Sequence, residues 1–152
     1  MTINEDAIYQ VVIGTPRGDI TMELDPKLAP KTVNNFVTLA NQGYYDGLNF
    51  HRVEPGFVIQ GGCPEGSGRG GPGYRFADEP VKGDYELGAV AMANAGPDTN
   101  GSQFFICTAD LKGRLPKQYN LFGYVVDGMD AVLAIKKGDK FESVTVTERA
   151  HD

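Results

Sequence analysis

The sequence predicts a mainly β fold, a closed eight-stranded antiparallel β-barrel capped by two α-helices. Three observations support this fold class. The 152 residues include 20 glycines and 9 prolines, a composition that favours many turns and few long helices. Eight short segments have strand-like composition, whereas only two have helical periodicity. Closing the sheet would remove its exposed edges, and the two helices would cover the open ends.

The first expected element is a hairpin. Apolar residues fill positions 8–13, and residues 15–19 supply a turn with proline and glycine. After the turn, Ile20, Met22 and Leu24 alternate with polar residues. This alternation predicts a strand with one face in the core and the other in water.

Two segments have the periodicity of a helix. Residues 29–43 begin near Pro30 and end at Gly43, and their apolar positions fall at i, i+3, i+4 and i+7: Val33, Phe36, Val37 and Ala40. The second helix is expected within residues 128–138, where Met129, Val132 and Leu133 would share one face. Both segments are therefore predicted to be amphipathic.

The other strand candidates are short and apolar, at residues 50–53, 57–60, 87–92, 103–108, 121–126 and 142–148. Residues 61–73 contain seven glycines in thirteen positions and are expected to form a loop. The chain has no internal repeat or linker, so residues 1–152 are predicted to form a single domain.

Charge and cysteine content restrict the partners and the compartment. A net charge of −6 disfavours nucleic acid and anionic membranes as partners. The first six residues lack signal-peptide features, and no stretch of about 18 apolar residues is present, so we expect a cytoplasmic protein. In that reducing compartment Cys63 and Cys107 are expected to be free thiols.

Two motifs point to functions that their contexts do not support. The segment "GSGRGG" at 66–71 satisfies a dinucleotide-binding pattern, but Pro72 and Gly73 follow where that motif needs a helix. A nucleotide-dependent oxidoreductase would also require alternating strands and helices, which the sequence lacks. The tripeptide "NGS" at 100–102 is a formal glycosylation site, interpreted here as a turn.

Other catalytic and metal chemistries also lack their residues. A Ser-His-Asp triad would have to use His51, because His151 lies in the terminal tail, and His51 is interpreted as structural. Cys63, Cys107 and His51 do not have zinc-site spacing. Asp78 and Glu79 are interpreted as solvated turn residues. We expect no cofactor and no metal.

Polar residues next to aromatic residues suggest a binding groove. Arg52 follows Phe50, and Gln103 precedes Phe105, each at the i, i+2 spacing that places two side chains on one face of a strand. An apolar groove with a few hydrogen-bond donors is the general form of a small binding site. On residue patterns alone, a structural ion pair or a surface position is favoured for Arg52, and plain core packing is the usual role of residues such as Phe57 and Phe105.

Two long segments, "FHRVEPGFVIQGG" at 50–62 and "MANAGPDTNGSQFFI" at 92–106, resemble the signature sequences of the cyclophilin family of peptidyl-prolyl isomerases. The resemblance extends over roughly residues 11–148. It implies an eight-stranded barrel with two helices, which agrees with the independent element count. It also implies catalysis of rotation about X-Pro bonds in peptides and unfolded proteins, which assists protein folding. The alternative is a non-catalytic prolyl-peptide binding module or chaperone of the same fold.

The resemblance assigns roles to particular residues. It implies that Arg52 donates a hydrogen bond to the proline nitrogen as the amide twists, against a barrier of about 20 kcal/mol. It implies a substrate-binding set made up of Phe57, Val58, Gln60, Ala93, Asn94, Gln103, Phe105, Leu115 and Tyr119. Since Phe57 and Gln60 cannot share a face on a regular strand, the turn at Pro55 and Gly56 or a bulge must redirect one of them.

The sequence departs from the family at the rim of the expected site. Many members carry a tryptophan there that binds cyclosporin, and this chain has no tryptophan. Residues 108–123 are one residue longer than the common form, with Arg114 nearest the missing position. Tyr119 stands where many relatives have histidine. We therefore expect weakened cyclosporin binding.

Overall fold

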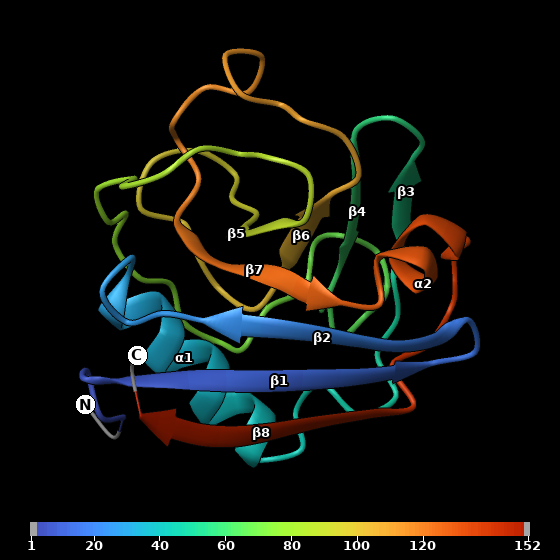
Figure 1. Cartoon of the computed structure of the whole chain (residues 1–152), viewed down its shortest axis with the longest axis horizontal. Coiled ribbons are helices and arrows are strands. Elements are labelled where there is room, and N and C mark those ends of the chain that lie inside the picture. The colour runs from blue at the N-terminus through green and yellow to red at the C-terminus, as the bar shows by residue number, and fades with distance from the viewer. Residues whose placement is uncertain (1–2, 151–152) are drawn as a thin grey trace.

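The computed structural model describes residues 3–150, so His151 lies outside the described residues. The expected eight strands and two helices are confirmed (Figure 1). In chain order they are β1 (Ala7–Thr15), β2 (Gly18–Leu24), α1 (Pro30–Asn41), β3 (Arg52–Glu54), β4 (Val58–Gly61), β5 (Ala89–Met92), β6 (Phe104–Cys107), β7 (Leu121–Asp127), α2 (Met129–Ala134) and β8 (Ser143–Ala150).

The strands form one antiparallel sheet in the order β3-β4-β6-β5-β7-β2-β1-β8. The predicted closure into a barrel is wrong, because β3 and β8 do not pair with each other within residues 3–150. Strand β3 has only three residues, and the segment before it bonds instead to the segment before β8. Phe50 N donates to Asp139 O over 2.9 Å, and Gly138 N donates to Phe50 O over 2.8 Å. These loop contacts bridge the gap between the two edge strands.

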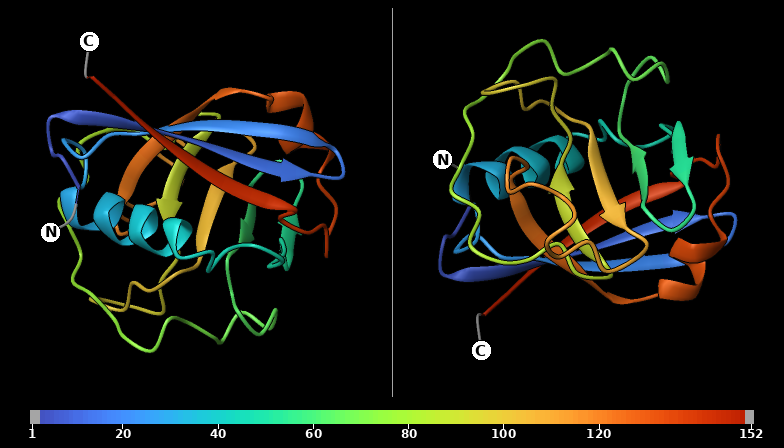
Figure 2. Two further views of the ribbon diagram at one scale, coloured as in Figure 1. Left: turned by 90° about the horizontal axis from the view of Figure 1, so that it is seen from below. Right: turned by 90° about the horizontal axis from the view of Figure 1, so that it is seen from above.

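The sheet is curved (Figure 2), and the core inside it is rich in aromatic residues. Phe104 on β6 meets Phe36 of α1 edge-on, with ring centroids 5.3 Å apart, and Phe36 stacks on Tyr45 at 4.6 Å. The face of α1 predicted from its periodicity is buried in this core. Such offset and edge-to-face pairs are the favoured arrangement of aromatic rings.

Helix α2 is shorter than its periodicity suggested. It begins after Gly128, whose φ of 86° favours glycine, and has six residues. Val132 is buried, but Leu133 is 58% exposed, so the apolar face expected from Met129, Val132 and Leu133 is buried only in part. The chain leaves the helix at Ile135, and this residue fills the buried position instead. Neither helix of residues 3–150 has the length and apolarity that crossing a bilayer requires.

Strands β4, β5 and β6 are buried on both faces. Their inward side chains join the interior core, whereas Val58, Ala91, Phe105 and Cys107 join a second cluster outside the sheet, under residues 108–120. The expected free thiols are confirmed, since Cys63 and Cys107 are both unbridged and buried. Burial, followed by the charge of Asp110, raises the pKa of Cys107 to about 12.

The start of α1 is capped from a distant loop. Glu79 accepts hydrogen bonds from Lys31 N at 3.1 Å, Thr32 N at 2.8 Å and Thr32 Oγ1 at 2.7 Å. Its own backbone N–H donates to Asn120 Oδ1 at 2.9 Å. A carboxylate at this end also interacts favourably with the helix dipole. The interpretation of Glu79 as a solvated turn residue is therefore wrong.

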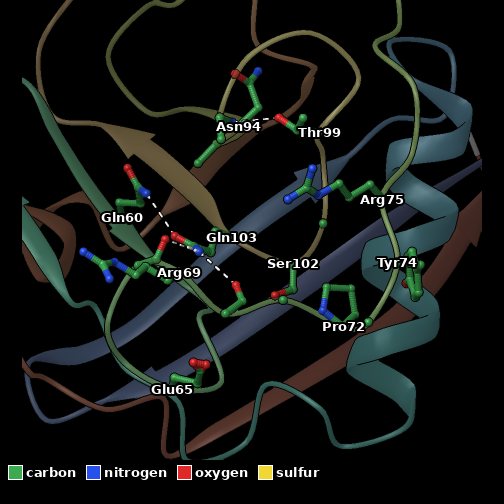
Figure 3. A pocket seen from close by; sticks show the side chains of 17 residues that line it. Gln60, Glu65, Arg69, Pro72, Tyr74, Arg75, Asn94, Thr99, Ser102 and Gln103 are labelled. Carbon is green, nitrogen blue, oxygen red and sulfur yellow. Dashed lines mark hydrogen bonds between the residues drawn. The ribbon is translucent and has the colours of Figure 1, made fainter.

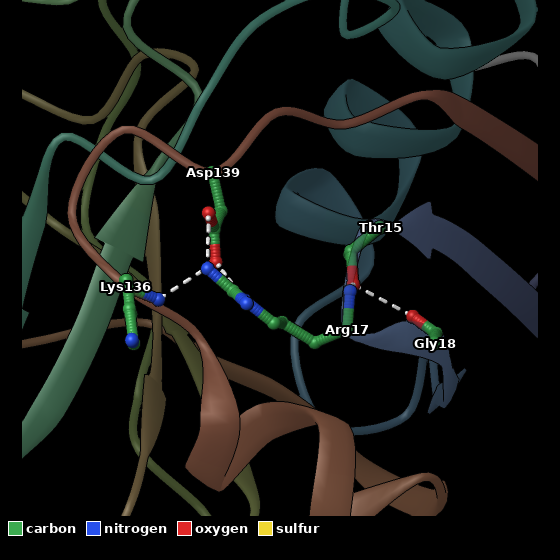
Figure 4. A network of polar contacts seen from close by, with 5 residues as sticks. All are labelled: Thr15, Arg17, Gly18, Lys136 and Asp139. Carbon is green, nitrogen blue, oxygen red and sulfur yellow. Dashed lines mark hydrogen bonds and ion pairs between the residues drawn. The ribbon is translucent and has the colours of Figure 1, made fainter.

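An ion pair ties the β1–β2 turn to the segment before β8 (Figure 4). Arg17 Nε and Nη2 donate to the two oxygens of Asp139 at 2.9 and 3.2 Å, and Lys136 N donates to Oδ2 at 2.8 Å. The hydrogen bond from Arg17 is the main reason that the pKa of Asp139 lies below its ordinary value. The contact fastens the loop that also bonds to Phe50.

Candidate active site

Arg52, Gln60 and Phe105 lie in one row across three neighbouring strands. Arg52 on β3 pairs with Gln60 on β4, and Gln60 pairs with Phe105 on β6. Directly paired residues point to the same face of an antiparallel sheet. The fold therefore places a cation, an amide and an aromatic ring side by side on the outer face of the sheet.

This row borders a pocket of about 130 Å³, called here the Arg52 pocket. Nine of the ten residues predicted for the site line it: Arg52, Phe57, Val58, Gln60, Ala93, Asn94, Phe105, Leu115 and Tyr119. The tenth, Gln103, lies next to Gln60 and lines a neighbouring cavity. The fold thus brings together segments up to 67 positions apart (119 − 52).

The aromatic wall of the Arg52 pocket has a support that the sequence did not reveal. Phe105 and Tyr119 meet edge-on with ring centroids 5.4 Å apart, and Tyr85 lies behind them. The Tyr85 hydroxyl donates to Tyr119 O at 2.6 Å and accepts from Tyr119 N at 3.1 Å. Burial raises the pKa of Tyr85 to about 12, so this hydroxyl stays protonated as a donor. Tyr85 belongs to a long loop, and its sequence carries no periodic signal.

Leu115 is held by a turn that rests on the same tyrosine. Its N–H donates to Leu111 O at 3.0 Å, and Leu111 N donates to Tyr85 O at 2.8 Å. Leu111 is fully buried in the outer cluster. Within the lengthened segment 108–123, the part that contributes Leu115 to the pocket is therefore anchored to Tyr85.

The turn between β3 and β4 explains how Phe57 reaches the pocket. Strand β4 begins at Val58, so Phe57 is a turn residue and is free of the strand alternation. Phe57 N donates to Glu54 O at 3.0 Å, and Gly56 adopts a φ of 71°. Of the two expected explanations for the positions of Phe57 and Gln60, the structure has the turn.

A chain of hydrogen bonds runs from Arg52 to the glycine-rich loop, and Figure 3 shows its part from Gln60 through Gln103. Arg52 Nη1 donates to Gln60 Oε1 at 3.3 Å, and Gln60 Nε2 donates to Gln103 Oε1 at 3.2 Å. Gln103 Nε2 in turn donates to the carbonyls of Gly68 and Gly70 at 2.9 and 3.0 Å. Gln60 thus contacts Arg52 directly, and Gln103 contacts it only through Gln60.

Glu54 is a further partner of Arg52 that the sequence reading missed. Its Oε1 accepts from Arg52 Nε at 2.9 Å and lies 2.8 Å from Nη2. The guanidinium carbon of Arg52 also lies 5.9 Å from the centre of the Phe57 ring. The "RVE" spacing of i, i+2 was the signal that could have revealed this ion pair.

His51 does not take part in a catalytic dyad within the described residues. Its Nδ1 is buried without a hydrogen-bond partner, and the loop at Gly68 packs close to its Nε2. Burial, and then the positive charges of Arg52 and Lys137, lower the pKa of His51. The ring is therefore neutral at neutral pH, in keeping with a structural role.

Next to the Arg52 pocket lies a larger cavity of about 900 Å³, called here the loop cavity. It shares Gln60, Ala93 and Asn94 with the Arg52 pocket, and loop residues 68–75 form much of its wall. Figure 3 shows the Arg75 side chain reaching from that loop toward the space between Thr99 and Gln103. Ala93 N donates to Gln103 O at 3.0 Å, which holds the shared border in place.

Comparison with known proteins identifies the family. The profile of the cyclophilin type peptidyl-prolyl cis-trans isomerase family matches residues 9–151. A peptidyl-prolyl cis-trans isomerase of Helicobacter pylori is 50% identical over 87% of this chain and 83% of its own length. Peptidyl-prolyl cis-trans isomerase B of Bacillus subtilis is 49% identical over 84% of this chain and 90% of its own.

Solved structures agree with the sequence relatives. A cyclophilin type isomerase of Cryptosporidium parvum superposes with a TM-score of 0.84 at 34% identity, covering 92% of this chain and 98% of its own. The same protein crystallised in the presence of the dipeptide Ala-Pro gives 0.78 at 35% identity, covering 94% and 99%. This chain therefore belongs to the cyclophilin-type peptidyl-prolyl cis-trans isomerases, enzymes that accelerate rotation about the bond preceding proline.

Proposed function

We propose that the Arg52 pocket is the place where this isomerase holds proline, with Arg52 as the catalytic residue. The observation that carries this proposal is the row of Arg52, Gln60 and Phe105 beside a small pocket with apolar walls. The pocket has room for a single ring, and a cation lies at its edge. The Cryptosporidium parvum relative studied with Ala-Pro supports proline peptides as ligands.

The chemistry follows from the electronic structure of an amide. Resonance keeps the bond to the proline nitrogen flat, with a barrier of about 20 kcal/mol. Twisting returns the lone pair to the nitrogen, so a donor near that atom binds the twisted state more tightly than either flat state. A hydrogen bond from a cation is worth about 1.5–3 kcal/mol, or roughly ten- to hundredfold in rate.

The remaining acceleration requires that one end of the bond stays fixed while the other turns. Phe57, Phe105, Leu115 and Tyr119 would hold the proline ring, with Val58 and Ala93 filling the adjacent wall. The backbone at Asn94 would bond to the residue before proline as an added strand does. Apolar contacts and main-chain bonds recognise little beyond proline, so we propose flexible and unfolded chains as substrates and a role in assisting protein folding. We also propose a cytoplasmic location, which the two unbridged thiols support because cysteines stay reduced in that compartment.

The test is exchange spectroscopy on a short X-Pro peptide with the wild type and with Arg52→Ala. We expect Arg52→Ala to lower kcat/KM about ten- to hundredfold. A dispersed spectrum of the variant would show that it remains folded. Unchanged turnover by Arg52→Ala would contradict the proposed role of the guanidinium. Tight peptide binding without turnover by the wild type would favour a binding module instead.

Cyclosporin binding is proposed to be weak, because the sequence contains no tryptophan. Arg114 is the residue nearest the position where many relatives have that ring, and it is exposed. Removal of one hydrogen bond and its stacking surface would weaken binding by about tenfold or more. Titration calorimetry measures this directly, and a nanomolar dissociation constant would contradict it.

A further inference from the structure

We propose that Glu54 is a positioning residue that holds the Arg52 guanidinium in place at the edge of the Arg52 pocket. The inference rests on the catalytic role proposed above for Arg52. It concerns a residue on the same short strand, separated from Arg52 by Val53. No other residue of β3 carries a charge.

The location of β3 explains why Arg52 needs a restraint. Strand β3 is the end strand of the sheet and pairs only with β4. The side chains of Arg52 and Glu54 are 45% and 47% exposed. A long, flexible side chain at such an edge can turn into water in many rotamers, and each of these removes the donor from the pocket.

Glu54 is the stronger of the two polar restraints on Arg52. Its Oε1 accepts from Nε at 2.9 Å and lies 2.8 Å from Nη2, so two nitrogens of the guanidinium are fixed by a charged acceptor. The bond to the neutral amide of Gln60 is longer, at 3.3 Å. Hydrogen bonds between ionised partners are shorter and stronger than neutral ones.

The two restraints act on different nitrogens and together define an orientation. Glu54 takes Nε and Nη2, and Gln60 takes Nη1. In this orientation the guanidinium carbon lies 5.9 Å from the centre of the Phe57 ring, which also lines the pocket. The ion pair therefore holds the cation beside the pocket and does not draw it away.

The donor count leaves Arg52 able to act on a substrate. A guanidinium has five N–H groups, one on Nε and two on each terminal nitrogen. The hydrogen bonds to Glu54 and Gln60 use the N–H of Nε and one N–H of Nη1, and the contact of Nη2 with Glu54 occupies at most one N–H of that nitrogen. One N–H on each terminal nitrogen stays available for the proline nitrogen. The pairing fixes the donor without consuming it.

The experiment replaces Glu54 by glutamine, which keeps the shape and removes the charge. We expect Glu54→Gln to lower kcat about three- to tenfold in exchange spectroscopy on an X-Pro peptide, while KM changes less than twofold. Glu142→Gln removes the charge of an exposed residue next to β8 and serves as the matched control, with unchanged kinetics expected.

Two further measurements separate positioning from a general charge effect. In an Arg52→Ala background, Glu54→Gln should cause no additional loss, because there is no guanidinium to position. In NMR spectra the Nε–H signal of Arg52 should exchange slowly with water in the wild type and rapidly in Glu54→Gln.

The possible results have distinct meanings. Unchanged kcat in Glu54→Gln would overturn the inference and make the ion pair a surface contact only. An increase in kcat would also overturn it, because Glu54 would then restrain Arg52 from acting. If Arg52→Ala retains full activity, the role proposed for Arg52 fails first. A large loss in Arg52→Ala together with unchanged Glu54→Gln refutes only the role of Glu54.

Discussion

The Arg52 pocket and the loop cavity adjoin each other but are built on different kinds of structural element, strands in the first and largely a loop in the second. The Arg52 pocket, of about 130 Å³, stands on β3, β4 and β6 and has aromatic walls supported by Tyr85. The loop cavity, of about 900 Å³, is walled largely by a segment rich in glycine and polar side chains. Paired strands fix side chains firmly, whereas loops accept changes of sequence more readily. On the proposed function, the small pocket would hold the proline ring and the large cavity would accept varied neighbouring residues.

The two spaces share part of their lining, so the proline site proposed above adjoins the loop cavity. Gln60, Ala93 and Asn94 line the Arg52 pocket and the loop cavity together. A chain whose proline lies in the first would continue into the second. If the Arg52 pocket recognises proline and the loop cavity recognises the residues before it, substitutions in the two regions should alter the recognition of different parts of the substrate.

The largest effect in this comparison is expected from deletion of an aromatic ring in the Arg52 pocket. Phe57→Ala should lower kcat/KM for X-Pro peptides about tenfold, mostly through KM, because apolar contact with the proline ring is lost. The matched variant Tyr74→Ala removes an exposed ring from the loop cavity and should change kcat/KM less than twofold. Steady-state kinetics by exchange spectroscopy compares them. Equal losses would contradict the division between the two regions.

A smaller effect is expected from Arg75, one of the two arginines that line the loop cavity. For a substrate peptide that carries glutamate two residues before its proline, Arg75→Gln should lower kcat/KM about two- to fivefold. The effect is small because an exposed ion pair contributes little. With glutamine at that position the same variant should behave like the wild type. Lys31→Gln, on the exposed face of α1, provides the charge control. A uniform loss for both peptides would mean that Arg75 does not recognise charge.

The smallest effect lies outside both regions. Asp139→Asn removes the ion pair with Arg17 and should lower Tm by about 1–3 °C at pH 7 without changing kcat/KM. Because folding lowers the pKa of Asp139, its stabilisation is present above the ordinary aspartate pKa and is lost as the pH falls through the folded value. Thermal unfolding at pH 7, 5 and 3 should therefore show the two proteins converging. A constant difference at all three pH values would contradict this assignment.

The elements were predictable wherever packing follows a local period. The alternation of Ile20, Met22 and Leu24 and the buried face of α1 appear as expected. Sheet closure was not predictable in this way, because it depends on which backbone groups meet across long distances. Phe50 bonds to residues 138 and 139, and no local pattern encodes that contact. The exposure of Leu133 was not predicted for a related reason, since α2 ends one residue later and the helical pattern does not continue.

The residues that line the candidate site were predictable from the sequence, but the residues that hold them in place were less so. The two family signatures contain most of the pocket lining, and the resemblance supplied the remainder. Tyr85, which bonds to the backbone of Tyr119, lies in a loop whose sequence has no periodic spacing of apolar residues. Glu54 was visible as the neighbour of Arg52 at i+2, but its orientation depends on the turn that follows. Polar contacts between distant segments require the fold itself.

The carboxylate of Glu79 joins the first turn of α1 to the loop that continues into the wall of the loop cavity. A fluctuation that detaches this loop also uncaps the helix, so the amide protons of Lys31 and Thr32 would become open to exchange with solvent at the same moment. Hydrogen–deuterium exchange at these two amides would then report how often the wall opens, in the resting enzyme and with no ligand added.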